Sequence, residues 1–171
     1  YLTKYMAPEF ETMLVIGDKD SHEQDADHLI MNLGLDPVVV PEMKRDISPL
    51  NDGYAYQKIK KLIEKFRPDI VHTHAAKSGV IGRLAADACK VPVIVHTFHG
   101  HVFHSYFSKF KTNTFIQIER YLARRSTGII AISDTQKHEL ANVYHICEPE
   151  KIKIIPLGLD LDKFNIHQDV K

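Results

Sequence analysis

The sequence predicts an α/β fold, a Rossmann-like, doubly wound and mostly parallel sheet. Short apolar runs alternate with stretches of roughly 10–20 residues in which apolar side chains recur at helical spacing, a pattern typical of βαβ units. The chain has 171 residues, enough for one domain that removes about 70% of its unfolded surface from water. A hydrophobic content of 44% and a charged content of 26% are ordinary for a soluble globular protein.

The first predicted elements lie before residue 50. The apolar run 13–17 predicts a strand buried on both faces. Apolar residues at helical spacing predict a helix over 22–34, with Gly34 as its C-cap. The proline-bracketed run 37–41 predicts a second strand, and the polar residues 42–50 predict a loop.

The middle of the chain repeats this alternation. An amphipathic helix over 51–66 ends before Pro68, because a proline disfavours the helical conformation of the residue that precedes it. A strand at 69–74 follows, and then a helix over 78–90 whose small residues suit close packing on a sheet. Residues 91–98 predict the next strand.

The last predicted elements are a loop at 99–107, a helix at 108–126, a strand at 128–132, a helix at 134–146 and a strand at 152–156. Right-handed crossovers then place helices on both faces of the sheet.

The chain turns polar after Leu157, which marks the exit from the domain. We therefore assign residues 1–160 to the domain and 161–171 to the start of an interdomain linker. In an open parallel sheet, ligands bind outside the carboxyl ends of the strands. This rule selects the segments 72–78, 97–106, 133–135 and 157–160.

Charge, hydropathy and cysteine content exclude several classes of protein. Lys and Arg number 22 and Asp and Glu number 22, so the basic excess of a nucleic-acid-binding protein is missing. No apolar run approaches the roughly 18 residues of a membrane-spanning helix. The two cysteines, Cys89 and Cys147, form no CxxC motif, so neither a disulfide scaffold nor a structural zinc site is expected.

Histidines gather in the segments that the strand-end rule selects. Of the 11 histidines, six lie between residues 72 and 104. His74 and His99 fall at strand ends, where a neutral imidazole can bond a hydroxyl or phosphate oxygen or act as a base. His72 and His96 fall inside strands, where we expect hydrogen-bonded core histidines.

A metal site is the alternative for the same segments. The pairs His72-x-His74 and His99-x-His101 could ligate zinc or iron. A catalytic zinc usually takes three protein ligands with carboxylates behind them, and the loop 99–107 contains no Asp or Glu. No metal ligands are therefore assigned.

Five motifs, in order, carry a resemblance to a known family. They are Asp69–His74 (DIVHTH), Lys77–Ala86 (KSGVIGRLAA), Val91–Gly100 (VPVIVHTFHG), Ile129–Ser133 (IIAIS) and Ile154–Asp160 (IIPLGLD). Over residues 11–165, the chain resembles the amino-terminal domain of family 4 glycosyltransferases, whose GT-B fold has two Rossmann-like domains facing each other across a cleft. The string from Thr97 to Phe103 is most similar to a bacterial subset that builds capsular, exopolysaccharide or O-antigen chains.

The resemblance implies roles for the matching residues. His99 matches the family's cleft-facing histidine, which contacts the donor sugar and is treated as catalytic. Gly100 would let the sugar approach the backbone closely. The residues that would line the acceptor side are His74, Lys77, Thr97 and His101.

Two further residues are candidates for substrate binding, each with a plain structural alternative. Arg45 lies in a polar loop and could meet an acceptor phosphate, or it could be a solvated surface residue. Ser133 lies at a strand exit, where it could contact substrate or serve as the N-cap of the helix at 134–146.

The resemblance also implies a reaction. A retaining hexosyltransferase would move a sugar from a nucleotide-sugar, expected to be a UDP-sugar, to a lipid-linked or saccharide acceptor in cell-surface polysaccharide synthesis. It would need no cofactor or metal and would work in the cytoplasm, at the inner face of the plasma membrane. The alternatives are a non-catalytic module that binds a nucleotide or sugar, and a metal-dependent hydrolase that uses the histidine pairs.

Two parts of the family pattern are missing from the sequence. One is the second domain, which holds the donor nucleotide. The other is the first strand with its Gly-Gly loop, which normally precedes the helix that ends near residues 1–6. We therefore expect a fragment that is inactive alone and whose sheet has a gap. Exposed strand edges at that gap would favour self-association or a rearranged strand order.

The segment 105–126 is the candidate for membrane contact. It carries one acid, Glu119, against the basic residues Lys109, Lys111, Arg120, Arg124 and Arg125. A basic amphipathic helix can lie on an anionic membrane surface. The alternative is an ordinary helix that packs its apolar stripe on the sheet and leaves its charges solvated.

Overall fold

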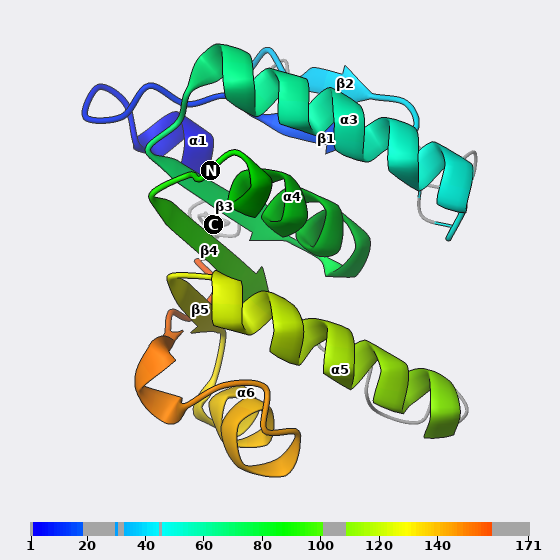
Figure 1. Cartoon of the computed structure of the whole chain (residues 1–171). Coiled ribbons are helices and arrows are strands. Elements are labelled where there is room, and N and C mark those ends of the chain that lie inside the picture. The colour runs from blue at the N-terminus through cyan, green and yellow to red at the C-terminus, as the bar shows by residue number, and fades with distance from the viewer. Residues whose placement is uncertain (1, 19–29, 31–32, 45, 101–108, 159–171) are drawn as a thin grey trace, which may run out of the picture.

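The computed structural model of the chain describes residues 2–18, 30, 33–44, 46–100 and 109–158 (Figure 1). The strands are β1 (Val15–Gly17), β2 (Val38–Val40), β3 (Ile70–His74), β4 (Val93–Phe98), β5 (Gly128–Ala131) and β6 (Ile152–Ile154). The α-helices are α1 (Leu2–Tyr5), α3 (Pro49–Phe66), α4 (Ala76–Ala88), α5 (Lys109–Arg125) and α6 (Asp134–His138). The predicted α/β class and all six predicted strands are confirmed.

The strands form two parallel sheets. β1 pairs with β2, and β3, β4, β5 and β6 pair in that order. In the larger sheet, the register places His74 of β3 beside Thr97 of β4. The polar ends of these neighbouring strands therefore meet at one edge of the sheet.

The two sheets are interrupted between β1 and β3. Among the described residues, β1 pairs only with β2, and β3 pairs only with β4. No pairing among the described residues joins β1 or β2 to the larger sheet, which agrees with the gap expected there. The alternative expectation, a rearranged strand order, stays a prediction. The prediction that residues 13–17 are buried on both faces is wrong, because β1 at this open edge is only half-buried. Self-association through the edge stays a prediction.

Three long helices share one layer. Figure 1 shows α3, α4 and α5 side by side across the strands. Ala55, Ile59 and Ile63 of α3 enter one hydrophobic cluster with residues of β2, α4 and β4. The helix predicted over 22–34 lies mostly outside the described residues. At its end, Gly34 has a φ of 65°, and the Leu35 N–H donates to the Ile30 carbonyl at 3.1 Å. Both features are typical of a helix that ends at a residue in the left-handed conformation.

Small residues let α4 approach the sheet closely, as its composition predicted. A Cβ atom at Gly79 would lie 2.5 Å from Cε1 of His96, and one at Gly82 would lie 2.7 Å from the methyl group of Thr73. Both glycines are thus required by the short distance between α4 and the β3–β4 pair.

A buried ion pair joins α4 to α5. Arg83 is 1% exposed, and its Nη2 donates to both carboxylate oxygens of Glu119, at 3.0 and 2.8 Å. Its Nε donates to the Gly79 carbonyl at 2.8 Å. Burial lowers the pKa of Arg83 and raises that of Glu119, and each charge opposes this shift in the other. Removing either partner would leave an uncompensated buried charge.

The helix predicted over 134–146 is α-helical only to His138. A π-helical turn, Glu139–Val143, follows, with the Tyr144 N–H donating to the Glu139 carbonyl at 2.8 Å. The wider turn buries the adjacent residues Leu140 and Ala141 together. The predicted continuous α-helix is therefore wrong over its second half. Among the described helices, none has the length and hydropathy needed to cross a bilayer.

Matched glycine substitutions test the close approach of α4. We expect Gly79→Ala to destabilise the fold by about 1–3 kcal/mol, because the new methyl group meets the buried His96 ring. Gly53→Ala on α3 should instead stabilise it by about 0.5–1 kcal/mol, since no described atom beyond its chain neighbours and its own helix backbone lies within 4 Å of its Cβ position. Urea unfolding measures both changes, and equal effects of the two substitutions would contradict this packing.

Candidate functional site

Histidines from β3 and from the end of β4 meet at the carboxyl edge of the larger sheet. His74 Nδ1 lies 2.8 Å from His99 Nε2, within hydrogen-bond distance. The ring centroids of His72 and His74 are 4.2 Å apart, and those of His74 and His99 are 5.1 Å apart. His99 is exposed and His74 is half-buried, so the cluster reaches the surface through His99.

The side chain of Thr97 belongs to this cluster. Thr97 is 6% exposed, and its Oγ1 lies 2.7 Å from His72 Nε2. Alternation along a strand places His72 and His74 on one face of β3 and Thr73 on the other. Thr97 thus joins the cluster from β4 as the partner of His72.

His96 lies on the opposite face and is a buried core histidine, as predicted. It is 1% exposed, and its Nδ1 lies 2.9 Å from Thr73 Oγ1. Burial, helped by the nearby positive charge of Arg83, lowers the pKa of His96 to about 2. The ring is therefore neutral at physiological pH and serves to pack α4 on the sheet. His72, which was also expected in the core, is exposed as a residue, but its ring nitrogen that meets Thr97 is part-buried in the strand-end cluster.

The pKa values of both cluster histidines of β3 are also lowered. Burial lowers the pKa of His74 to about 4, with further contributions from His72 and His99. Burial and His99 together lower the pKa of His72. Neutral imidazoles carry one donor and one acceptor nitrogen each, which suits them to bind the hydroxyl groups of a sugar.

Lys77 is tied to the amino-terminal end of α3. Its ammonium group forms an ion pair with Asp52 and donates to the Asp46 carbonyl. Asp52 in turn accepts a hydrogen bond from the Ser48 N–H, at 3.1 Å. The predicted acceptor-side lysine therefore lies near the histidine edge with two protein partners of its own.

Ser133 is the N-cap of α6, which confirms the capping alternative, and its contact with substrate stays a prediction. Its hydroxyl accepts from the Gln136 N–H at 3.2 Å. Gly100 follows His99 at the surface, and no described atom lies within 4 Å of its Cβ position. Two of the predicted site residues, Arg45 and His101, lie outside the described residues.

Two features of the site were not predicted. The Arg83–Glu119 pair has one faint sequence signal, a lone acid on a basic helix. The pairing of His72 with Thr97 has none, because it depends on strand register. Within the part of the chain that the structure describes, no three His, Cys, Asp or Glu side chains gather closely enough to hold a metal ion.

A parallel α/β sheet with polar side chains gathered at its carboxyl edge is the architecture of a Rossmann-like domain, a class of fold whose ligands bind at that edge. The family model described as Glycosyltransferase Family 4 matches residues 1–163. The chain belongs to this family, as the sequence motifs indicated.

Two curated relatives are similar over most of the chain. UDP-Gal:alpha-D-GlcNAc-diphosphoundecaprenol alpha-1,3-galactosyltransferase of Escherichia coli is 37% identical over 125 residues, which cover 73% of this chain and 32% of that protein. Capsular polysaccharide biosynthesis glycosyltransferase CapM of Staphylococcus aureus is 30% identical over 132 residues, which cover 75% of this chain and 34% of that protein. The chain thus spans about a third of the length of these relatives.

Solved structures show the same fold at lower identity. A glycosyltransferase from Rickettsia africae aligns with 96% of this chain and 39% of its own, with a TM-score of 0.64 and 20% identity. A putative UDP-N-acetylglucosamine 2-epimerase from Listeria monocytogenes aligns with 88% of this chain and 39% of its own, with a TM-score of 0.66 and 19% identity. The Rossmann-like architecture is therefore shared by proteins of different activity.

We expect acid to destabilise the fold through its histidines. The folded pKa values of about 4 for His74 and about 2 for His96 lie below the ordinary 6.5. Below pH 6.5 the unfolded chain therefore binds protons that the folded chain does not, so stability is present above pH 6.5 and is lost as the pH falls towards 4. The midpoint temperature of thermal unfolding should therefore decrease as the pH is lowered from about 7 to about 5.

A non-titrating residue isolates the contribution of His74. His74→Asn should reduce the fall in midpoint, whereas His138→Asn, an exposed residue of α6, should leave it unchanged. A midpoint that stays constant or rises over the same interval would contradict the assignment.

Proposed function

We propose that this chain is the acceptor-side domain of a retaining hexosyltransferase. The enzyme transfers a sugar from a UDP-sugar to a lipid-linked saccharide during synthesis of a cell-surface polysaccharide. It works at the cytoplasmic face of the plasma membrane and holds no resident cofactor. The family match and the acceptor named for the Escherichia coli galactosyltransferase support this proposal.

The observation that carries the proposal is the position of His99. Its ring is exposed at the carboxyl end of β4, where ligands of open parallel sheets bind, and His74 supports it from the neighbouring strand. A positioned imidazole can bond a sugar hydroxyl and hold the anomeric carbon in reacting geometry. It can also place a dipole near the charge that develops as the bond to the nucleotide breaks.

Replacement of His99 tests this role. In the full-length protein, His99→Ala should lower the rate of sugar transfer at least ~100-fold, the usual scale for one positioned catalytic group. The assay measures transfer from a panel of UDP-sugars to an undecaprenyl-diphosphate-linked acceptor, with the anomeric configuration of the product read by NMR.

The matched control is His138→Ala, which removes an exposed histidine of α6 whose Nδ1 bonds only Asn142 in the described structure. This variant should retain wild-type turnover. Near-normal turnover of His99→Ala would overturn the catalytic role of His99. A wild-type protein that binds nucleotide-sugars but transfers none would favour the binding-module alternative.

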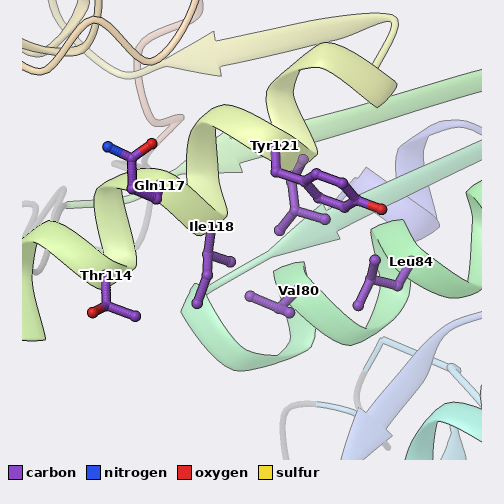
Figure 2. A pocket seen from close by; sticks show the side chains of 7 residues that line it. Val80, Leu84, Thr114, Gln117, Ile118 and Tyr121 are labelled. Atoms are coloured by element: carbon purple, nitrogen blue, oxygen red, sulfur yellow. The ribbon is translucent and has the colours of Figure 1, made fainter.

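The outer face of α4 and α5 supports contact with the membrane that holds such an acceptor. An open groove of about 460 Å³ lies between the two helices. Figure 2 shows Val80 and Leu84 of α4 facing Ile118 and Tyr121 of α5 across it. Further along α5, Phe110 is 82% exposed. An apolar groove beside an exposed aromatic ring fits the interfacial region of a bilayer.

Basic side chains flank this apolar face. Lys111 and Arg124 of α5 are exposed. Arg125 lies over the Tyr121 ring at 3.6 Å and forms an ion pair with Asp87 at 3.0 Å. The excess of positive charge complements the anionic lipids of a cytoplasmic leaflet.

Charge reversal tests the membrane contact. The double variant Lys111→Glu/Arg124→Glu should weaken binding to phosphatidylglycerol-containing vesicles at least about tenfold, at roughly 1 kcal/mol per basic residue. Vesicle co-sedimentation of the full-length protein at low and high salt measures the effect. Lys61→Glu/Lys65→Glu makes the same charge change on exposed residues of α3 and should bind like wild type. Equal loss in both double variants would show only a dependence on net charge.

A further inference from the structure

His74 and His99 face each other through defined ring nitrogens. The contact joins Nδ1 of His74 to Nε2 of His99 at 2.8 Å. Of the two ring nitrogens of His99, Nδ1 is therefore the one outside this hydrogen bond. Because two ring nitrogens share one bond, one of them carries the proton and the other does not. The tautomer of each ring is thereby tied to that of the other.

His74 is itself held in place from several sides. Its ring lies against the His72 ring, with centroids 4.2 Å apart, and His72 is anchored by Thr97 at 2.7 Å. Its backbone carbonyl accepts from the Ser78 hydroxyl at 2.5 Å. These contacts give His74 a fixed orientation on β3, whereas His99 lies exposed at the end of β4.

The backbone directly after His74 is strained. Ala75 has a φ of 58° and a ψ of 165°, a conformation rarely adopted by a residue with a side chain. It turns the chain sharply from β3 into α4, so that His74 ends the strand at the edge of the sheet. Such strain persists only where the surrounding structure holds it, and it clusters at functional sites.

We propose that His74 is a positioning residue that orients His99 and selects its tautomer through the Nδ1–Nε2 hydrogen bond, so that His99 presents its Nδ1 edge to the substrate. This inference rests on the proposed transferase function. It gives His74 a role that differs from direct contact with the acceptor, because His74 acts through His99. His72 and Thr97 complete the support as a second layer behind His74.

Two amide substitutions distinguish the roles of the two ring nitrogens of His74. Asn places a polar group near the position of Nδ1, and Gln places one near Nε2. In the full-length enzyme, His74→Ala and His74→Gln should lower kcat about 10- to 100-fold with little change in the KM for the acceptor, as for loss of an orienting partner. His74→Asn should restore kcat to within about fivefold of wild type. A raised acceptor KM with unchanged kcat would show direct substrate contact and overturn the proposal.

The second readout needs no activity. With ¹⁵N-labelled histidine, the ring nitrogens of His99, assigned by their loss in His99→Ala, should show one dominant neutral tautomer in the wild-type protein. His74→Ala should give a mixture of both tautomers, and His74→Asn should keep one. Unchanged His138 signals would confirm that each variant is folded. A mixture in the wild type, or no change in His74→Ala, would overturn the proposal. Inactive wild-type protein with a locked His99 tautomer would instead refute the transferase function alone.

Discussion

The close contact of α4 with the β3–β4 pair governs the rest of this structure. Gly79 and Gly82 leave the room that the His96 ring and the Thr73 methyl group occupy. Those two side chains are buried and bonded to each other across the strands, which supports the parallel register of β3 and β4. Because strand side chains alternate between faces, that register also sets the positions of His74 and Thr97 on the other side of the sheet. The strand-end cluster thus depends on the contact of α4 with the opposite face of the sheet.

A second buried contact extends this arrangement to α5. Arg83 and Glu119 are both almost fully buried, and a paired charge in the interior costs less than a lone one. The pair fixes the long basic helix beside α4, which creates the apolar groove between them. The strand-end cluster and the groove are therefore both positioned by α4, through the residues that face the sheet and the residues that face α5.

The sequence predicted much of the site because strand ends can be located from hydrophobic patterns. His74 and His99 were selected for their places at the ends of predicted strands, and the structure brings them into contact. The capping alternative for Ser133 could be seen in the sequence because capping depends on a residue only three positions away. The partner of Lys77 was not foreseen, since Asp52 belongs to a separate helix. The π-helical turn after His138 was missed because one wider turn changes the spacing of apolar residues too little to be seen in the sequence.

The sequence by itself determined the order of the strands and of the three long helices, the strand-end position of the histidines and the membership of glycosyltransferase family 4. These features follow from periodicity and motifs that are local along the chain. Only the tertiary structure decided that His72 bonds Thr97 and that Arg83 bonds Glu119. Each of these depends on strand register or on helix placement. Neither is encoded in local spacing, because both result from packing between segments that are distant in sequence.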